Sequence, residues 1–132
     1  MAQKYRHENT SVSAVNYHLV WIVRRRRSIL KGTLDSRAKE LIQEKAEAMG
    51  CQVLALETDL NHVHLFVNCP PTYSPAYVVQ QVKRYSSHAL RVEFPWLKAK
   101  LPSLWTRAYF AATTGRVSGD TIKRYVESQK SK

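Results

Sequence analysis

Residues 59–67 read Asp59-Leu60-Asn61-His62-Val63-His64-Leu65-Phe66-Val67, and a Cys-Pro-Pro segment at 69–71 ends the apolar run. The density of Val, Leu and Phe after His62 predicts a mostly buried β-strand. Because side chains alternate along a strand, His62 and His64 share one face and Val63, Leu65 and Val67 share the other. Two imidazoles on one face can bind a divalent metal if a third ligand arrives from elsewhere. The alternative is a pair of half-exposed histidines without a ligand.

The composition is that of one globular domain. The chain has 132 residues, 44% of them hydrophobic and 23% charged, which allows one core but not two. No apolar run approaches the ~18–20 residues that span a bilayer, and we find no signal peptide. We therefore expect a cytoplasmic protein without a membrane partner.

The charge is strongly positive. Lys and Arg number 21 against 10 acidic residues, giving a net charge of +11 and a pI near 10.0. This favours a polyanionic partner, nucleic acid before an anionic membrane, because no basic amphipathic helix dominates. A basic protein without such a partner is the alternative.

The order of predicted elements is β-α-β-β-α-β. We expect a flexible N-terminal arm at residues 1–13 and a single domain at 14–132. Within that domain we expect strands at 14–23, 51–57, 62–69 and 104–112, and helices at 34–49 and 75–92. This order predicts an α+β, ferredoxin-like (RRM-like) split β-α-β sandwich with an antiparallel sheet and both helices on one face. His62 and His64 would then lie on the open face, which carries nucleic acid in RRM domains.

Several basic residues are candidate DNA contacts. Arg24, Arg25, Arg26 and Arg27 directly follow the first strand. Guanidinium groups there could bind phosphates or guanine edges, although a solvated turn is the alternative. The second helix carries Lys83 and Arg84 outside its predicted buried stripe, where they contact a phosphate or only solvent. The stripe itself is predicted to be Tyr77, Val78, Gln81, Val82, Tyr85, Ala89 and Val92.

Cys51 and Cys69 are the two cysteines, and we expect them near the ends of neighbouring strands. In a reducing compartment they would be buried thiols rather than a disulfide. A zinc site that joins them to His62 and His64 is the alternative, but the spacing matches no zinc-finger pattern.

The last segment combines a glycine-punctuated link at residues 113–119 with a short predicted helix at 120–130. Tyr125 and Gln129 stand four residues apart on this helix, so their side chains are neighbours. This places a phenol beside an amide oxygen on a segment that two glycines allow to move.

Together these segments resemble the HUH single-tyrosine transposases of small insertion sequences, in which two histidines flank a bulky apolar residue. Four motifs carry the resemblance, which extends over residues 14–130. They are Tyr17-His18-Leu19-Val20-Trp21 with its basic continuation, His62-Val63-His64, Leu104-Trp105-Thr106-Arg107-Ala108-Tyr109-Phe110, and Thr121-Ile122-Lys123-Arg124-Tyr125-Val126-Glu127-Ser128-Gln129. The four arginines depart from the Lys-Tyr-Arg-Arg type of sequence that relatives often have, which leaves the hairpin preference open.

The resemblance implies a site and a reaction. Tyr125 would be the nucleophile, and His62, His64 and Gln129 would hold a divalent metal, Mg²⁺ or Mn²⁺. The substrate would be single-stranded DNA at hairpin-marked transposon ends, cut and rejoined through a 5′-phosphotyrosine without ATP. The protein would be a prokaryotic homodimer whose active site is composed from both subunits. The resemblance also adds Arg107 to the candidate DNA contacts.

Three other functions fit parts of the sequence. One is a non-catalytic RRM-like module that stacks bases on aromatic side chains such as Phe66 and Tyr109. Another is a domesticated relative that serves repeated palindromic elements. The third is a metal-dependent hydrolase with Glu57 or Asp59 near the histidines, although neither carboxylate is clearly placed as a base.

Overall fold

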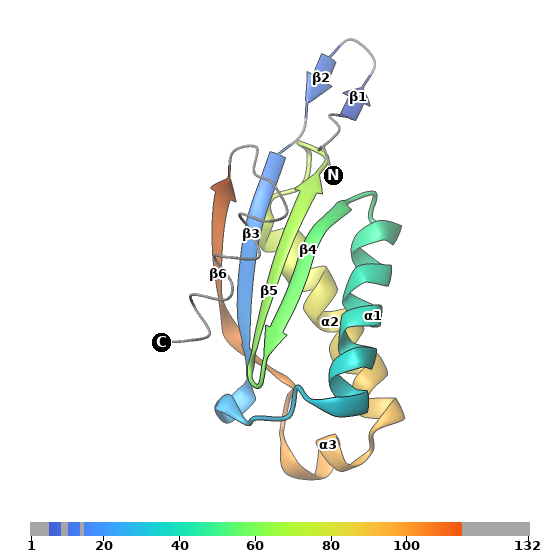
Figure 1. Ribbon diagram of the computed structural model, residues 1–132, viewed down its shortest axis with the longest axis vertical. Coiled ribbons are helices and arrows are strands. Elements are labelled where there is room, and N and C mark those ends of the chain that lie inside the picture. The colour runs from blue at the N-terminus through green and yellow to red at the C-terminus, as the bar shows by residue number, and fades with distance from the viewer. Residues whose placement is uncertain (1–5, 9–10, 14, 115–132) are drawn as a thin grey trace.

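The computed structural model describes residues 6–8, 11–13 and 15–114. Six strands, two long helices, one short helix and one 3₁₀ turn make up this part of the chain (Figure 1). The strands are β1 (Arg6–Glu8), β2 (Ser11–Ser13), β3 (Val15–Val23), β4 (Gln52–Asp59), β5 (His62–Cys69) and β6 (Trp105–Thr114). The helical elements are η1 (Arg24–Arg26), α1 (Gly32–Ala48), α2 (Pro75–Glu93) and α3 (Trp96–Lys100).

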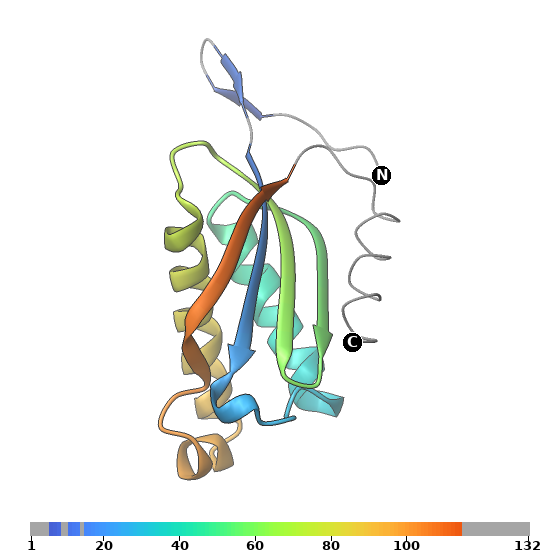
Figure 2. The ribbon, with the colours of Figure 1, turned by 90° about the vertical axis from the view of Figure 1, so that its left-hand side faces the viewer.

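The main sheet has four strands in the order β4-β5-β3-β6, and every neighbouring pair is antiparallel. The helices α1 and α2 pack side by side on one face of this sheet (Figures 1 and 2). This arrangement confirms the predicted α+β, ferredoxin-like sandwich. No helix among the described residues is long and apolar enough to cross a bilayer.

The core lies between the sheet and the two helices. On β5 the side chains of Val63, Leu65 and Val67 are fully buried in it, and Leu19 and Trp21 of β3 lie beside them. The helix α1 adds an apolar stripe at the helical spacing, and Gly50 ends the helix with a positive φ of 84° that favours glycine. The helix-facing side of the sheet is therefore the one predicted from the alternation in β5.

The predicted buried stripe of α2 is confirmed at Val78 and Val82 and wrong at Tyr77, Tyr85 and Val92. The buried positions are Val78, Val79, Val82, Ser86 and Leu90, whereas Tyr77, Tyr85 and Val92 are exposed. Ser86 tolerates burial because its hydroxyl donates to the carbonyl of Val82 at 2.8 Å and accepts from the Trp105 indole at 3.1 Å. The hydrogen-bonded hydroxyl of Ser86 thus occupies a core position, whereas the apolar pattern predicted its neighbour Tyr85 to be buried.

The N-terminal segment contains more regular structure than the arm expected at residues 1–13. Within it, β1 and β2 pair as a small antiparallel hairpin, which lies beyond the end of β3 (Figure 1). The short helix α3 occupies the connection between α2 and β6.

Cys51 and Cys69 are buried thiols, as predicted, with their sulfur atoms 3.1 Å apart. Cys69 closes β5 at the end opposite His62, and both cysteines belong to the helix-facing core. Cys69 stands seven positions after His62 along the strand, about 23 Å at the usual rise. The zinc site of two cysteines and two histidines is therefore wrong.

The first prediction concerns the β5 core. Leu65→Ala should lower the free energy of unfolding by about 2–5 kcal/mol, because a fully buried leucine leaves a cavity. Leu60→Ala, in the exposed β4–β5 turn, should change it by less than about 0.5 kcal/mol. Urea denaturation of both variants measures the difference, and equal losses would contradict the assigned core.

Candidate metal and nucleic-acid site

His62 and His64 stand on the face of β5 that points away from the helices. Across the sheet, His62 pairs with Ile22 of β3 and Asp59 of β4, while His64 pairs with Val20 and Glu57. The two rings are nearly parallel, with an interplanar angle of 22° and centroids 6.4 Å apart. The strand alternation has therefore brought both imidazoles to the same face, as predicted.

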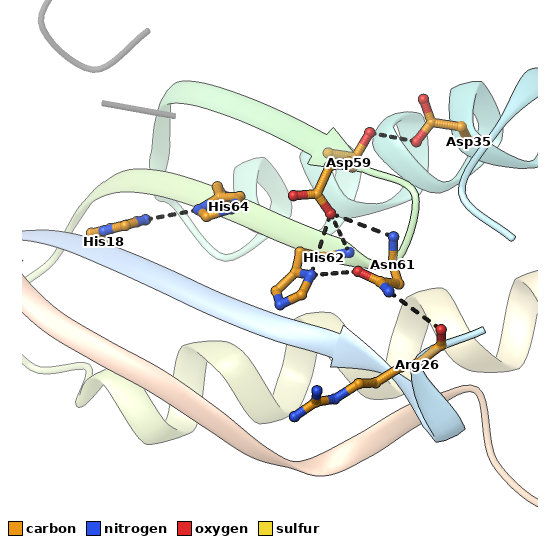
Figure 3. A network of polar contacts seen from close by, with 8 residues as sticks. His18, Arg26, Asp35, Asp59, Asn61, His62 and His64 are labelled. Atoms are coloured by element: carbon orange, nitrogen blue, oxygen red, sulfur yellow. Dashed lines mark hydrogen bonds and ion pairs between the residues drawn. The ribbon is translucent and has the colours of Figure 1, made fainter. Parts of the chain in front are cut away.

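The His62 ring is held by the β4–β5 turn that precedes it. The Asp59 carboxylate accepts from the backbone N–H groups of His62 at 2.9 Å and Asn61 at 3.4 Å. The Nδ1 atom of His62 lies 2.5 Å from Asn61 Oδ1 and 3.3 Å from Asp59 Oδ1 (Figure 3). Both neighbours present oxygens to Nδ1, so Nε2 is left to face outward with its lone pair.

His64 is held by a residue that sequence reasoning missed. His18 of β3 places its Nε2 atom 3.3 Å from His64 Nδ1 (Figure 3). The His18 ring also stacks on Phe66, with centroids 4.0 Å apart. Burial, and then the charge of His64, lowers the pKa of His18 to about 4. A neutral His18 can accept from His64 Nδ1, which leaves His64 Nε2 available to a metal.

The signal for His18 lies in the strand register and not in a motif. His18 pairs with Phe66, so it is the diagonal neighbour of His64 on the adjacent strand. Predicting that contact requires the antiparallel offset of β3 against β5, which the two strand sequences do not specify. The five-residue motif containing His18 entered only through the family resemblance.

The two imidazoles suit a divalent ion after a small adjustment. With metal–nitrogen bonds of about 2.1 Å, two imidazoles on one ion have centroids about 5 Å apart, so these rings must approach by about 1 Å. Among the described residues, no group of three His, Cys, Asp or Glu side chains could hold a metal. The predicted third ligand, Gln129, and the predicted nucleophile, Tyr125, lie outside the described residues.

The four arginines form a tight turn at the end of β3. Arg25 and Arg26 have positive φ values of 59° and 52°, a left-handed conformation that costs non-glycine residues about 1–2 kcal/mol each. Arg24 secures the turn, because its N–H donates to the Leu104 carbonyl at 2.8 Å and its guanidinium donates to Ser103 Oγ at 3.0 Å. The side chains of Arg25, Arg26 and Arg27 are exposed.

Lys83, Arg84 and Arg107 come together in one pocket. This pocket lies between α2 and β6, has a volume of about 360 Å³, and is completed by Ala76, Val79, Gln80 and Tyr109. Lys83 donates to the Thr106 carbonyl at 2.6 Å, and burial lowers its pKa. The lining contains three cationic groups and no carboxylate, so it suits an anion such as a phosphate.

The predicted functional groups gather toward one end of the sheet. Ile22, which pairs with His62, stands two residues before Arg24, and Val23 pairs with Trp105, two residues before Arg107. The imidazoles lie on the open face and the cationic pocket on the helix side. The described structure therefore places the imidazoles and the arginine turn toward one end of the sheet, with the cationic pocket on its helix side.

Comparison with known proteins assigns the chain to a family. Residues 11–129 match the profile of the family described as "Transposase IS200 like". The ISDra2 transposase TnpA of Deinococcus radiodurans is 31% identical over 123 residues, which cover 92% of this chain and 88% of that protein. The chain belongs to the IS200-like transposase family.

Further comparisons find the same family or the same fold. The transposase for insertion sequence IS200 of Salmonella typhimurium is 27% identical over 86% of this chain and 78% of its own length. A crystal structure of a proposed transposase from Deinococcus radiodurans superposes with a TM-score of 0.77 at 26% identity, covering 94% of this chain and 97% of that one. A REP-associated tyrosine transposase bound to a REP hairpin shares the fold, with a TM-score of 0.61 at 14% identity, over 92% of this chain and 67% of that one.

Family membership also bears on the other functions. The hydrolase alternative requires Asp59 or Glu57 as a base. The Asp59 carboxylate already accepts two backbone N–H groups of the turn, so it is poorly placed for that role. Phe66, one of the aromatics proposed for base stacking, is buried against His18. Phe66 is therefore not placed to stack a base, whereas Tyr109, the other aromatic proposed for this role, is 43% exposed.

Proposed function

We propose that the chain is a metal-dependent transposase that cuts and rejoins single-stranded DNA at hairpin-marked transposon ends. The observation that carries this proposal is the arrangement of His62 and His64. Both rings lie on one sheet face, and both have Nδ1 within reach of a partner that leaves Nε2 available. Membership of the IS200-like transposase family supports the reaction class.

The nucleophile in this proposal is Tyr125. Its phenolate oxygen attacks the scissile phosphorus, forms a 5′-phosphotyrosine bond and displaces the 3′-oxygen, which leaves as a free 3′-hydroxyl after taking up a proton. Tyrosine has an ordinary pKa of about 10, so neighbouring positive charge must favour the phenolate. The new ester conserves the phosphodiester, and attack by another 3′-hydroxyl restores Tyr125 and joins the strands without ATP.

His62, His64 and Gln129 are the proposed ligands of a divalent cation. The chemistry that such an ion supplies is polarisation of a non-bridging phosphate oxygen and orientation of the scissile bond. Two imidazoles and an amide oxygen suit Mn²⁺ better than Mg²⁺, which prefers oxygen ligands throughout. Mg²⁺ would be held with the help of substrate oxygens.

The proposed DNA contacts are Arg24, Arg25, Arg26 and Arg27 in the turn, and Lys83, Arg84 and Arg107 in the pocket. Within the described part of the chain, no carboxylate forms an ion pair with Arg25, Arg26 or Arg27. A net charge of +11 also favours a nucleic acid. The structural relative bound to a REP hairpin supports a hairpin-bearing substrate.

We also propose a homodimer, with β6 as part of the contact. This strand pairs with β3 on one side, and the described residues contain no strand on its other side. Tyr109 and Phe110 of β6 are 43% and 53% exposed, so this edge offers aromatic surface that a partner could bury. A second subunit would cover this edge.

The central prediction tests the nucleophile. An oligonucleotide carrying the element's own hairpin end, incubated with Mn²⁺, should yield a protein–DNA adduct that survives denaturing electrophoresis. Tyr125→Phe should abolish the adduct, because phenylalanine has no hydroxyl to attack the phosphorus. Chelation of the metal should abolish it too.

A matched control is Tyr85→Phe, which removes a phenol that donates to Glu44 on the helix layer. This variant should retain the adduct. If the wild-type protein binds its hairpin end tightly but forms no adduct, the chain is a binding module and the transposase reaction is wrong.

A mixing experiment tests the composite active site. His64→Ala and Tyr125→Phe should each be inactive, but co-expression should restore roughly a quarter of the wild-type number of active sites if subunits pair at random in a two-fold dimer. This follows because each mixed dimer regains one intact site when the tyrosine serves the partner's histidines. The yield of protein–DNA adduct measures the fraction of restored sites. If verified mixed dimers form no adduct, each subunit uses its own tyrosine.

Salt dependence tests the cationic pocket. Lys83→Gln and Arg107→Gln should each reduce the slope of log affinity against log salt by about 0.9 for a duplex hairpin stem, because each removes one phosphate contact. Lys98→Gln, on the exposed surface of α3, makes the same charge change and should leave the slope unaltered. Equal slopes for all three variants would exclude the pocket as a DNA contact.

A further inference from the structure

Asn61 lies between the first candidate metal ligand and the arginine turn. Its Oδ1 atom is 2.5 Å from His62 Nδ1, and its Nδ2 atom is 3.3 Å from the carbonyl oxygen of Arg26. Figure 3 shows the Asn61 amide between these two groups, with the Arg26 carbonyl directed at it. One side chain therefore joins the open face of the sheet to the turn at its end.

The two contacts determine how the amide is oriented. A backbone carbonyl can only accept a hydrogen bond, so Asn61 must present its NH₂ group to Arg26. The opposite atom of the amide, Oδ1, is then the one that faces His62, and it can only accept. His62 must therefore carry its proton on Nδ1 and its lone pair on Nε2, the atom that faces outward.

The backbone of the same turn reinforces this connection. Val23 N–H donates to the Asn61 carbonyl at 2.9 Å, and Leu30 N–H donates to the Leu60 carbonyl at 2.9 Å. The β4–β5 turn is thus bound to the chain on both sides of the arginines. Arg25 and Arg26 adopt left-handed backbone conformations, which persist only where surrounding contacts hold them.

We propose that Asn61 is a positioning residue that fixes the metal-binding tautomer of His62 and couples it to DNA bound at the arginine turn. The side chains of Arg25, Arg26 and Arg27 are exposed and their fork geometry suits phosphates. DNA phosphates that hold the turn in this conformation also hold the Arg26 carbonyl in the position where it accepts from Asn61 Nδ2. By linkage, DNA at the turn raises the affinity of His62 for metal, and metal raises the affinity of the turn for DNA.

The coupling rests on the proposed function, but the tautomer does not, and the two parts have separate measurements. Nitrogen-15 NMR of the histidine side chains in the metal-free protein reports which nitrogen of His62 carries the proton. The wild-type ring should be protonated on Nδ1. Asn61→Asp keeps both acceptors for Nδ1 and should keep this tautomer. Asn61→Leu leaves only the longer contact to Asp59 Oδ1 at 3.3 Å and should weaken the preference. A wild-type His62 protonated on Nε2 would overturn the assignment.

Metal affinity measures the second part. Titration of Mn²⁺ by electron paramagnetic resonance should show about tenfold weaker binding in Asn61→Leu, the usual effect of removing a group that orients a ligand. Asn61→Asp should bind Mn²⁺ nearly as tightly as the wild type. Gln43→Glu, the same amide-to-carboxylate change on the exposed surface of α1, controls for added charge.

The probe for coupling is a DNA hairpin without single-stranded flanks, which offers no scissile phosphate to the metal. In wild-type protein and in Gln43→Glu, this hairpin should tighten Mn²⁺ binding severalfold. In Asn61→Asp the effect should disappear, because a carboxylate cannot donate to the Arg26 carbonyl. An effect that persists in Asn61→Asp, or is absent from the wild type, would overturn the coupling.

The failure of the proposed function gives a different result. If wild-type protein binds Mn²⁺ no better than His62→Ala, the metal site is wrong, whereas the NMR measurement still decides whether Asn61 fixes the His62 tautomer. If the metal binds and the wild-type tautomer is correct but Asn61→Leu alters neither, Asn61 is not a positioning residue.

Discussion

The structure depends on the alternation of side chains along β5. Val63, Leu65 and Val67 are fully buried against the helices, and complete burial of such side chains is worth about 1.5–3 kcal/mol each. A shift of one residue would expose all three and place His62 and His64 in the apolar layer, where an unpaired polar group costs about 1–3 kcal/mol. Both effects favour the same register, so the imidazoles reach the open face as a consequence of core packing.

The turn between β4 and β5 supplies the side chains that orient His62. Only Leu60 and Asn61 separate the two strands, so Asp59 and His62 stand opposite each other. The Asp59 carboxylate thereby caps the turn and also lies beside the imidazole. The same contacts that stabilise the hairpin orient a candidate ligand, which explains why a carboxylate so close to the histidines is poorly placed to act as a base.

The sequence was sufficient for the fold because apolar alternation and helical spacing agree along the chain. It was less informative wherever polar groups are buried. Ser86 occupies a core position because two hydrogen bonds satisfy its hydroxyl, and the apolar pattern of α2 pointed instead to Tyr85. His18 reaches His64 through the offset between β3 and β5, and Asn61 reaches His62 through the conformation of a turn. Such contacts are set by tertiary geometry, which spacing in one sequence does not encode.

The separation of chemistry from charge carries a functional consequence. The imidazoles lie on the open face, while the arginine turn and the cationic pocket lie at the end and the helix side of the sheet. A divalent ion on the histidines would add positive charge to a chain that already carries +11, which would strengthen the attraction of a polyanion. DNA that binds the sheet end can compensate this charge without occupying the metal ligands. The Asn61 side chain contacts both the Arg26 carbonyl and the His62 ring, so it connects the two regions directly.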